Sequence, residues 1–262
     1  MTRPIALARS RIGNGPPIVL VHGSGTDRGR WAPVLRPLAD RFAVHAVDRR
    51  GHGESADRAD YRIEDEFGDL AALLDGIGDD RTTVVAHSYG ALCALGAASR
   101  NAPVGRLVLY EPPLAASPEA YCPPGLIAAM RAAIDRGDPE AAAAAFASGV
   151  LGMGRPEIER RRRLGLWDPM VAGIRIVLRE LESVARYAMQ APRFAACAQP
   201  TLLLVGGNSA AEYHATAAAL VAVLPNSRVQ LLQGQGHRAI DTAPELFVTA
   251  VLEFIDATRQ AK

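Results

Sequence analysis

The stretch Thr82 to Gly90, TTVVAHSYG, decides the fold that this sequence predicts. A β-branched, apolar run leads into a sharp turn with Ser88 at its apex, and a helical sequence follows without a gap. A turn this tight forces its central residue toward positive φ, so the residues two positions before and after it must be small. Ala86 and Gly90 meet that requirement. The following helix would aim free N–H groups at any anion that forms beside the serine hydroxyl.

Ser88 has two interpretations at this point, because a serine can also cap an ordinary helix. The pentapeptide 86–90, A-H-S-Y-G, resembles the G-x-S-x-G nucleophile elbow of the α/β-hydrolase family, with alanine at the first glycine. The departure adds one methyl group, which many such turns should tolerate. The resemblance implies that Ser88 is a nucleophile.

Two other segments carry the same resemblance. The buried apolar run Ile18–Val21 leads into His22-Gly23-Ser24-Gly25, which is similar to the H-G-x-G loop of the family. Residues 48–55, D-R-R-G-H-G-E-S, match the family's D-x-x-G-x-G-x-S turn, whose role is architectural. The resemblance covers essentially the whole core in the right order and is missing only in one insertion.

The implied fold is the α/β-hydrolase fold, a mostly parallel central sheet flanked by helices, with an inserted all-helical cap. We expect residues 1–113 and 196–262 to form the core and residues 114–195 to form the cap. In that insertion, short strands vanish and helix starts such as Asp138-Pro139-Glu140 take over, because a capping aspartate followed by proline opens a helix. Strand-rich sequence resumes at Pro200. The insertion therefore lies between neighbouring strands of one sheet, like the cap that many α/β-hydrolases carry over the active site.

The charge balance bears on possible partners. Lysine and arginine total 29 and aspartate and glutamate 28, which gives a formal net charge of +1. Nothing in that balance indicates a nucleic-acid surface or an acidic polymer, so we expect a small-molecule substrate. The basic cluster Arg160–Arg163 follows glutamates and is expected to form a solvated helix face. The sequence does not define an oligomeric state.

The cysteines and the apolar segments bear on location and cofactors. Cys93, Cys122 and Cys197 are widely separated and form no C-x-x-C motif, so we expect reduced thiols in a cytoplasmic protein. We expect no signal peptide and no membrane span, because no apolar stretch is long enough. No histidine pair has metal-ligand spacing with a cysteine or carboxylate partner, so we expect no metal. We expect no cofactor either.

A serine hydroxyl needs a base to take its proton, and that base needs a third group to orient it. His237 follows the last predicted strand, Val229–Leu232, at a glycine-flanked turn, where the family places its catalytic histidine. The resemblance therefore implies that His237 is the base. We expect His22 to pin its loop and His87 to point into the packing of the elbow.

The acid is where the sequence departs from the family pattern. Most members have an aspartate a few residues beyond the strand equivalent to Thr201–Val205, but here residues 206–212 read G-G-N-S-A-A-E. Glu111 ends the adjacent predicted strand, and neighbouring strands are only about 4.8 Å apart, so its carboxylate could reach the same face of His237. Some family members place the acid there. The alternatives are a structural role for Glu111, or an orienting role for another side chain: Asn208, Glu212 or Asp241.

The chemistry implied by these residues is acyl transfer from an ester, thioester or lactone, through an acyl-enzyme on Ser88. By resemblance, the backbone amides of Ser24 and Tyr89 form the oxyanion hole. The cap contains large apolar residues that either line a substrate pocket or pack cap helices against one another. They are Met130, Phe146, Met153, Trp167 and Met170.

Two other functions remain open from the sequence. The displaced acid would suit an enzyme on the same scaffold that does not hydrolyse esters, such as a perhydrolase, a C–C bond hydrolase or a cofactor-free lyase. A ligand-binding protein that uses the cap as a lid is the third possibility. Fold alone cannot choose among them.

Overall fold

The computed structural model describes residues 3–114, 122–187 and 191–259 of the chain. Within these residues, one compact unit is formed by the described parts of 3–23, 27–113 and 191–259, and a second by 24–26, 114 and 122–187. The sequence placed the insertion at 114–195. Residues 191–195 group with the core, whereas Ser24–Thr26 group with the second unit.

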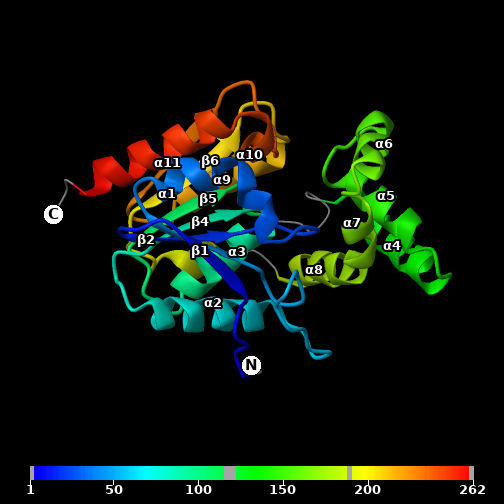
Figure 1. Cartoon of the computed structure of the whole chain (residues 1–262), viewed down its shortest axis with the longest axis horizontal. Coiled ribbons are helices and arrows are strands. Elements are labelled where there is room, and N and C mark those ends of the chain that lie inside the picture. The colour runs from blue at the N-terminus through cyan, green and yellow to red at the C-terminus, as the bar shows by residue number, and fades with distance from the viewer. Residues whose placement is uncertain (1–2, 115–121, 188–190, 260–262) are drawn as a thin grey trace. The chain divides into compact units, whose positions relative to one another are not determined.

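The core unit is built on a seven-stranded sheet in the order β1-β3-β2-β4-β5-β6-β7 (Figure 1). Only β1 runs antiparallel to its neighbour, and the other pairs are parallel, which confirms the expected mostly parallel sheet. The strands are β1 (Arg9–Ile12), β2 (Pro17–Val21), β3 (Ala43–Val47), β4 (Thr83–His87), β5 (Arg106–Tyr110), β6 (Thr201–Gly206) and β7 (Ser227–Leu232). Because the carboxyl ends of parallel strands meet at one edge, residues that follow β4, β5 and β7 converge there.

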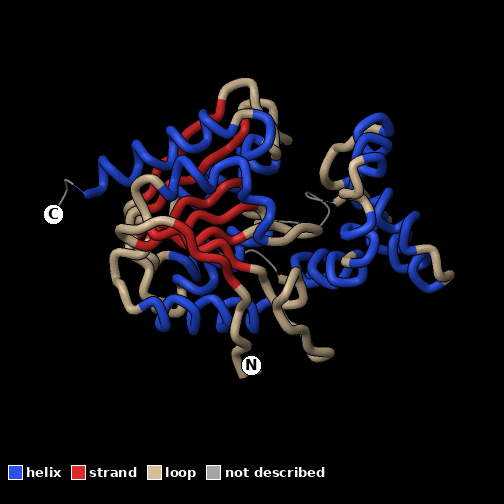
Figure 2. Tube along the Cα trace, viewed as in Figure 1, coloured by secondary structure: helices blue, strands red, loops and turns tan. Residues whose placement is uncertain are grey.

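The central strands are buried along their whole length. Every residue of β2 through β6 is buried, whereas β1 is exposed throughout. Parallel strands covered on both faces read as continuous apolar runs, and this is why the sequence located them. Figure 2 shows the strands as one layer with helices on either side.

The helices of the core are η1 (Arg28–Trp31), α1 (Ala32–Ala39), α2 (Ile63–Ile77), α3 (Tyr89–Ala98), η3 (Ala191–Phe194), α9 (Ala211–Val221), α10 (Ala239–Thr242) and α11 (Pro244–Arg259). On one face, Leu38 of α1 and Phe247 of α11 share an apolar cluster with Val44 and Tyr110 from the sheet. Helices α2 and α3 pack together on the other face (Figure 1). Helix α9 was not predicted from the sequence.

The second unit consists of helices with their own apolar cluster. They are α4 (Leu126–Asp135), α5 (Pro139–Gly149), α6 (Arg155–Arg163), α7 (Asp168–Ala172) and α8 (Ile174–Arg186). Asp138 caps α5 as predicted, because its carboxylate accepts a hydrogen bond from the Ala141 amide at 2.9 Å. The arginine run closes α6 and pairs with glutamates, for example Arg160 with Glu157 at 2.9 Å. This agrees with the expected solvated face.

All three cysteines are free and buried. Burial raises the pKa of the Cys197 thiol to about 11 and also raises the pKa of Cys122, so both thiols are protonated at neutral pH. Across the described ranges, none of the helices has both the length and the apolar composition that crossing a bilayer requires. In the same ranges, no group of three or more His, Cys, Asp and Glu side chains is arranged to hold a metal ion.

Candidate active site

Ser88 occupies the sharp turn between β4 and α3. Its φ of 52° and ψ of −126° confirm the positive φ that the sequence predicted, a conformation that costs a non-glycine residue energy. Its amide donates a hydrogen bond of 2.8 Å to the carbonyl of Tyr110 at the end of β5. From Thr82 to Ala98, every residue is buried except Ser88, which is half-buried. The turn thus exposes one side chain from an otherwise closed segment.

Gly90 allows α3 to approach the end of β2. A Cβ added at Gly90 would lie 2.3 Å from the carbonyl oxygen of His22 and 2.7 Å from that of Val21, closer than real side chains come. A Cβ at Gly23 would lie 3.0 Å from the Cβ of Ser88. The two segments recognised separately in the sequence, the elbow and the H-G pair, are therefore in contact.

His22 has the structural role that the sequence indicated. Its Nε2 accepts a hydrogen bond from the Arg49 amide at 3.0 Å, so the proton is on Nδ1, which donates to the Gly23 carbonyl at 2.7 Å. Both ring nitrogens are therefore occupied within the loop. His22 is fully buried and holds its loop against the turn that follows β3.

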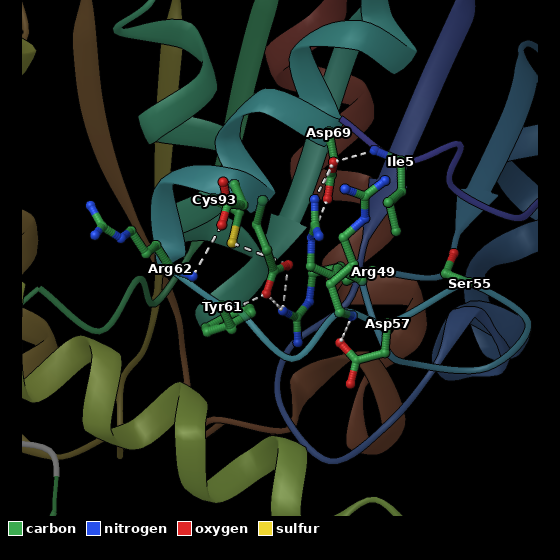
Figure 3. Close-up of polar contacts among 12 residues, drawn as sticks. Ile5, Arg49, Ser55, Asp57, Tyr61, Arg62, Asp69 and Cys93 are labelled. Carbon is green, nitrogen blue, oxygen red and sulfur yellow. Dashed lines mark hydrogen bonds and ion pairs between the residues drawn. The ribbon is translucent and has the colours of Figure 1, made fainter. Parts of the chain in front are cut away.

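A buried polar network centred on Arg49 was missed from the sequence (Figure 3). The Arg49 guanidinium donates to the carbonyls of His22 at 2.8 Å and Gly23 at 3.1 Å, and it pairs with Glu66 at 2.8 Å. It also lies over the ring of Tyr89, 4.9 Å from its centroid. Arg49 thus ties the loop after β2 to Tyr89, the residue that follows Ser88.

Tyr61 closes this network. Its hydroxyl donates to Glu66 Oε1 at 2.6 Å and lies 2.6 Å from the hydroxyl of Tyr89. Figure 3 shows Tyr61, Arg49 and Cys93 converging from different elements. A buried ion pair is weak support for stability by itself, but a network of this kind restrains the groups that it joins.

Glu111 and His237 are in direct contact. Glu111 follows β5 with a φ of 49°, and its side chain is fully buried. Its Oε1 accepts a hydrogen bond of 2.7 Å from the amide of Gly206, the last residue of β6, and its Oε2 accepts one from His237 Nδ1. Because a carboxylate only accepts, the proton lies on Nδ1, and Nε2 is the basic nitrogen of the ring.

The other candidates for the acid have different surroundings. Asp241 pairs with Arg30 at 2.5 Å and approaches Arg238 at 3.6 Å. Asn208 is exposed, and Glu212 is half-buried in the first turn of α9. Glu111 is the candidate whose carboxylate contacts the imidazole.

The loop that carries His237, residues 233–238, is held by side chains from β4 and β5; we refer to it as the histidine loop. His87 Nε2 donates to the His237 carbonyl at 3.0 Å, and the two rings are 4.6 Å apart. The Tyr110 hydroxyl donates to the Gly236 carbonyl and accepts from the Ala239 amide at 3.1 Å. His87 is buried as expected, but its contacts are with the histidine loop and with the ring of Tyr110, a role that the sequence did not indicate for either residue.

Burial determines the protonation states of His87 and Tyr110. Burial, assisted by the nearby His237 and Arg30, lowers the pKa of His87 well below its ordinary value, so the ring is neutral at neutral pH. Burial and the adjacent charge of Glu111 raise the pKa of the Tyr110 hydroxyl, which therefore keeps its donor proton. Both groups remain hydrogen-bond donors to the histidine loop.

The predicted oxyanion-hole residues lie in different units. Tyr89 is the first residue of α3, where backbone amides have no partner within the helix. Ser24 is half-buried and groups with the second unit, together with Gly25 and Thr26. The assignment of these two amides stays a prediction.

The residues proposed from the sequence to line a substrate pocket all lie in the helical unit. Each is at most 5% exposed, and all belong to the apolar cluster of that unit: Met130, Phe146, Met153, Trp167 and Met170. Contacts among α4, α5, α7 and α8 account for their burial. Their burial is consistent with the packing alternative, and their assignment to a substrate pocket stays a prediction.

A mostly parallel sheet with a serine in a strained strand-to-helix turn, followed along the chain by an acid and then a histidine, is the pattern of α/β-hydrolase folds. The model of one family, described as the alpha/beta hydrolase family, matches residues 18–250. The chain therefore belongs to the alpha/beta hydrolase family, and as a member of that family it is classed as a hydrolase.

Three similar proteins span nearly the whole chain. A 2-(acetamidomethylene)succinate hydrolase from Mesorhizobium japonicum is 27% identical over 259 residues, 94% of this chain and 90% of that protein. An alpha/beta hydrolase from Sphaerobacter thermophilus has 32% identity and a TM-score of 0.82, covering 97% of this chain and 99% of that one. The enol-lactonase from Burkholderia xenovorans has 25% identity and a TM-score of 0.75, covering 95% and 96%.

Proposed function

We propose that this protein is a serine hydrolase that cleaves a small, largely apolar ester, thioester or lactone through an acyl-enzyme on Ser88. The observation that carries the proposal is the contact between Glu111 Oε2 and His237 Nδ1 at the same sheet edge as the strained Ser88. That contact orients the imidazole and directs its basic nitrogen away from the carboxylate.

In the proposed reaction, Ser88 Oγ attacks the substrate carbonyl while His237 Nε2 takes its proton. The Glu111 carboxylate stabilises the imidazolium that forms, and the backbone amides of Ser24 and Tyr89 bind the oxyanion. His237 then gives the proton to the leaving group. A water molecule, activated by the same imidazole, hydrolyses the acyl-enzyme and restores Ser88.

The relatives support hydrolytic chemistry rather than a ligand-binding role. One similar protein is named a hydrolase of 2-(acetamidomethylene)succinate, and another is named an enol-lactonase. These names describe different substrates, so they support the class of reaction and not one substrate. The apolar character of the substrate is a prediction that an acyl-chain series tests directly.

A fluorophosphonate probe tests the proposal. We expect stoichiometric labelling of the wild-type protein, loss of labelling in Ser88→Ala, and turnover of p-nitrophenyl esters, thioesters or lactones. A panel of increasing acyl length then defines the preferred acyl group. Labelling without turnover of any member would favour a non-hydrolytic enzyme on the same scaffold. An unlabelled wild-type protein would overturn the nucleophile assignment and favour ligand binding.

A further inference from the structure

The segment that follows β6 places an aromatic ring on the imidazole. Residues 206–212 contribute no aspartate to His237, but Tyr213, in the first turn of α9, stacks on it. The ring centroids are 4.8 Å apart and the planes differ by only 18°. The rings of His87 and Tyr110 near His237 are tilted by 42° and 38°. Tyr213 is thus the neighbour that lies parallel to the imidazole.

The contact with Glu111 and the stack on Tyr213 restrain different motions of the ring. A hydrogen bond at Nδ1 fixes which edge of the imidazole faces the carboxylate, but it leaves the ring free to tilt about that bond. A parallel aromatic neighbour resists tilting, since offset stacking is favourable only while the planes stay nearly parallel. Together the two contacts define both the direction and the plane of the basic Nε2 atom.

Backbone contacts fix Tyr213 relative to the histidine loop. The Asn208 amide donates to the carbonyl of Gln235 at 2.8 Å, two residues before His237. The Ser209 amide donates to Gly206 at 3.0 Å, and the Tyr213 amide donates to Ala210 at 3.1 Å. The start of α9 is therefore joined to the loop that carries the imidazole, and the stack does not depend on side-chain packing alone.

We propose that Tyr213 is a positioning residue for His237: its stacked ring holds the imidazole plane so that Nε2 points at Ser88 Oγ. This inference rests on the proposed function, because it assumes that His237 is the base. Glu111, which binds Nδ1, directly follows β5, and Tyr213, which restrains the plane of the ring, lies in the segment after β6. The ring of Tyr213 and not its hydroxyl carries this role.

Two substitutions separate the ring from the hydroxyl. Tyr213→Phe keeps the stack, and we expect kcat and the fluorophosphonate labelling rate within about 2-fold of wild type. Tyr213→Leu removes the flat ring, and we expect both quantities to fall about 10-fold with an unchanged KM, because a misplaced base slows the chemical step without weakening binding. Val221→Ala, at the exposed end of the same helix, is the matched control and should match wild type.

A proton NMR measurement tests the positioning independently of turnover. The proton that His237 Nδ1 shares with Glu111 should give a low-field resonance, because the hydrogen bond is charge-assisted. We expect this resonance to persist in Tyr213→Phe and Val221→Ala and to broaden or disappear in Tyr213→Leu. If Tyr213→Leu does not fold, Tyr213→Met, which fills space without a flat ring, repeats the comparison.

The outcomes distinguish this inference from the proposed function. A wild-type protein that resists the probe would reject the proposed function, whereas the resonance would still report whether Tyr213 restrains the imidazole. A labelled wild type with an unchanged labelling rate in Tyr213→Leu would overturn the inference alone. Equal losses in Tyr213→Phe and Tyr213→Leu would also overturn it, because they would assign the effect to the hydroxyl.

Discussion

The nucleophile elbow and the histidine loop meet at one edge of the sheet, but they are held in different ways. The elbow is fixed by its own backbone: Ser88 adopts a strained turn, and Gly90 lets α3 approach the β2 end. The histidine loop is fixed by side chains from distant segments, chiefly His87, Tyr110 and Glu111. The comparison shows that the conformation of Ser88 is set by a local motif, whereas the position of His237 depends on side chains from several strands of the sheet.

The largest expected effect is a loss of kcat when the contact between Glu111 and His237 is changed. Glu111→Gln keeps an oxygen for the Gly206 amide but removes the charge that stabilises the imidazolium. We expect kcat to fall about 10³- to 10⁴-fold, the scale seen when a triad aspartate becomes asparagine in a serine protease. Steady-state kinetics on a p-nitrophenyl ester measures it.

Asn208→Ala is the matched control for that substitution. Asn208 is exposed, and its backbone amide, which the substitution leaves in place, makes the bond to Gln235. We expect kcat within about 2-fold of wild type, as for most surface substitutions. If Asn208→Ala lowers kcat more than Glu111→Gln does, the assignment of the acid is wrong.

A substitution in the elbow should change the free energy of unfolding. A methyl group at Gly90 would meet backbone carbonyl oxygens, which cannot rotate away, so we expect Gly90→Ala to destabilise the fold by about 3 kcal/mol. Gly76→Ala, inside α2, is the control, because a Cβ there meets nothing within 4 Å. Replacing glycine in a helix should stabilise the protein by about 0.5–1 kcal/mol. Urea denaturation measures both, and equal stabilities of the two variants would contradict a close approach at Gly90.

The smallest effect is a pH dependence that originates at His87. Its folded-state pKa is lowered, so the unfolded chain binds the additional proton as the pH falls below about 6.5. The free energy of unfolding should therefore be highest above that pH and decrease below it, by at most about 1.4 kcal/mol per pH unit for one proton. His87→Gln should flatten this decrease in chemical denaturation. Part of the slope should remain, because burial also lowers the pKa of His45.

A slope that is the same in both proteins would show that His87 does not titrate on unfolding. The lowered pKa of His87 would then no longer distinguish the histidine loop from the elbow, whereas the hydrogen bonds that hold the loop would be unaffected.

Much of the fold was predictable, because the information lay in local patterns. Continuous apolar runs located β2 through β6, and Asp138 correctly predicted a helix start. Helix α9 was missed, since its alanine-rich sequence has few large residues to mark a buried face. Tyr213 was missed with it.

The site was predictable only in part. Ser88 and His237 were predicted from family motifs and Glu111 from a comparison of adjacent strand ends, and the structure shows the contact between Glu111 and His237. The partners of Arg49 could not be found in this way, because a guanidinium that binds two carbonyls and a distant glutamate leaves no pattern at fixed spacing. The role of the five cap residues stays a prediction for a related reason: apolar character alone does not distinguish a pocket wall from a helix interface.

The Arg49 network has a consequence for local opening. Arg49 and Glu66 are 2% and 3% exposed, so separating them would leave an uncompensated charge inside the protein. We therefore expect no local opening of the loop after β2. The Arg49 amide, which donates to His22, should exchange its hydrogen only when the sheet itself unfolds. We therefore expect the backbone around His22 and Arg49, next to Ser88, to be among the slowest parts of the protein to exchange.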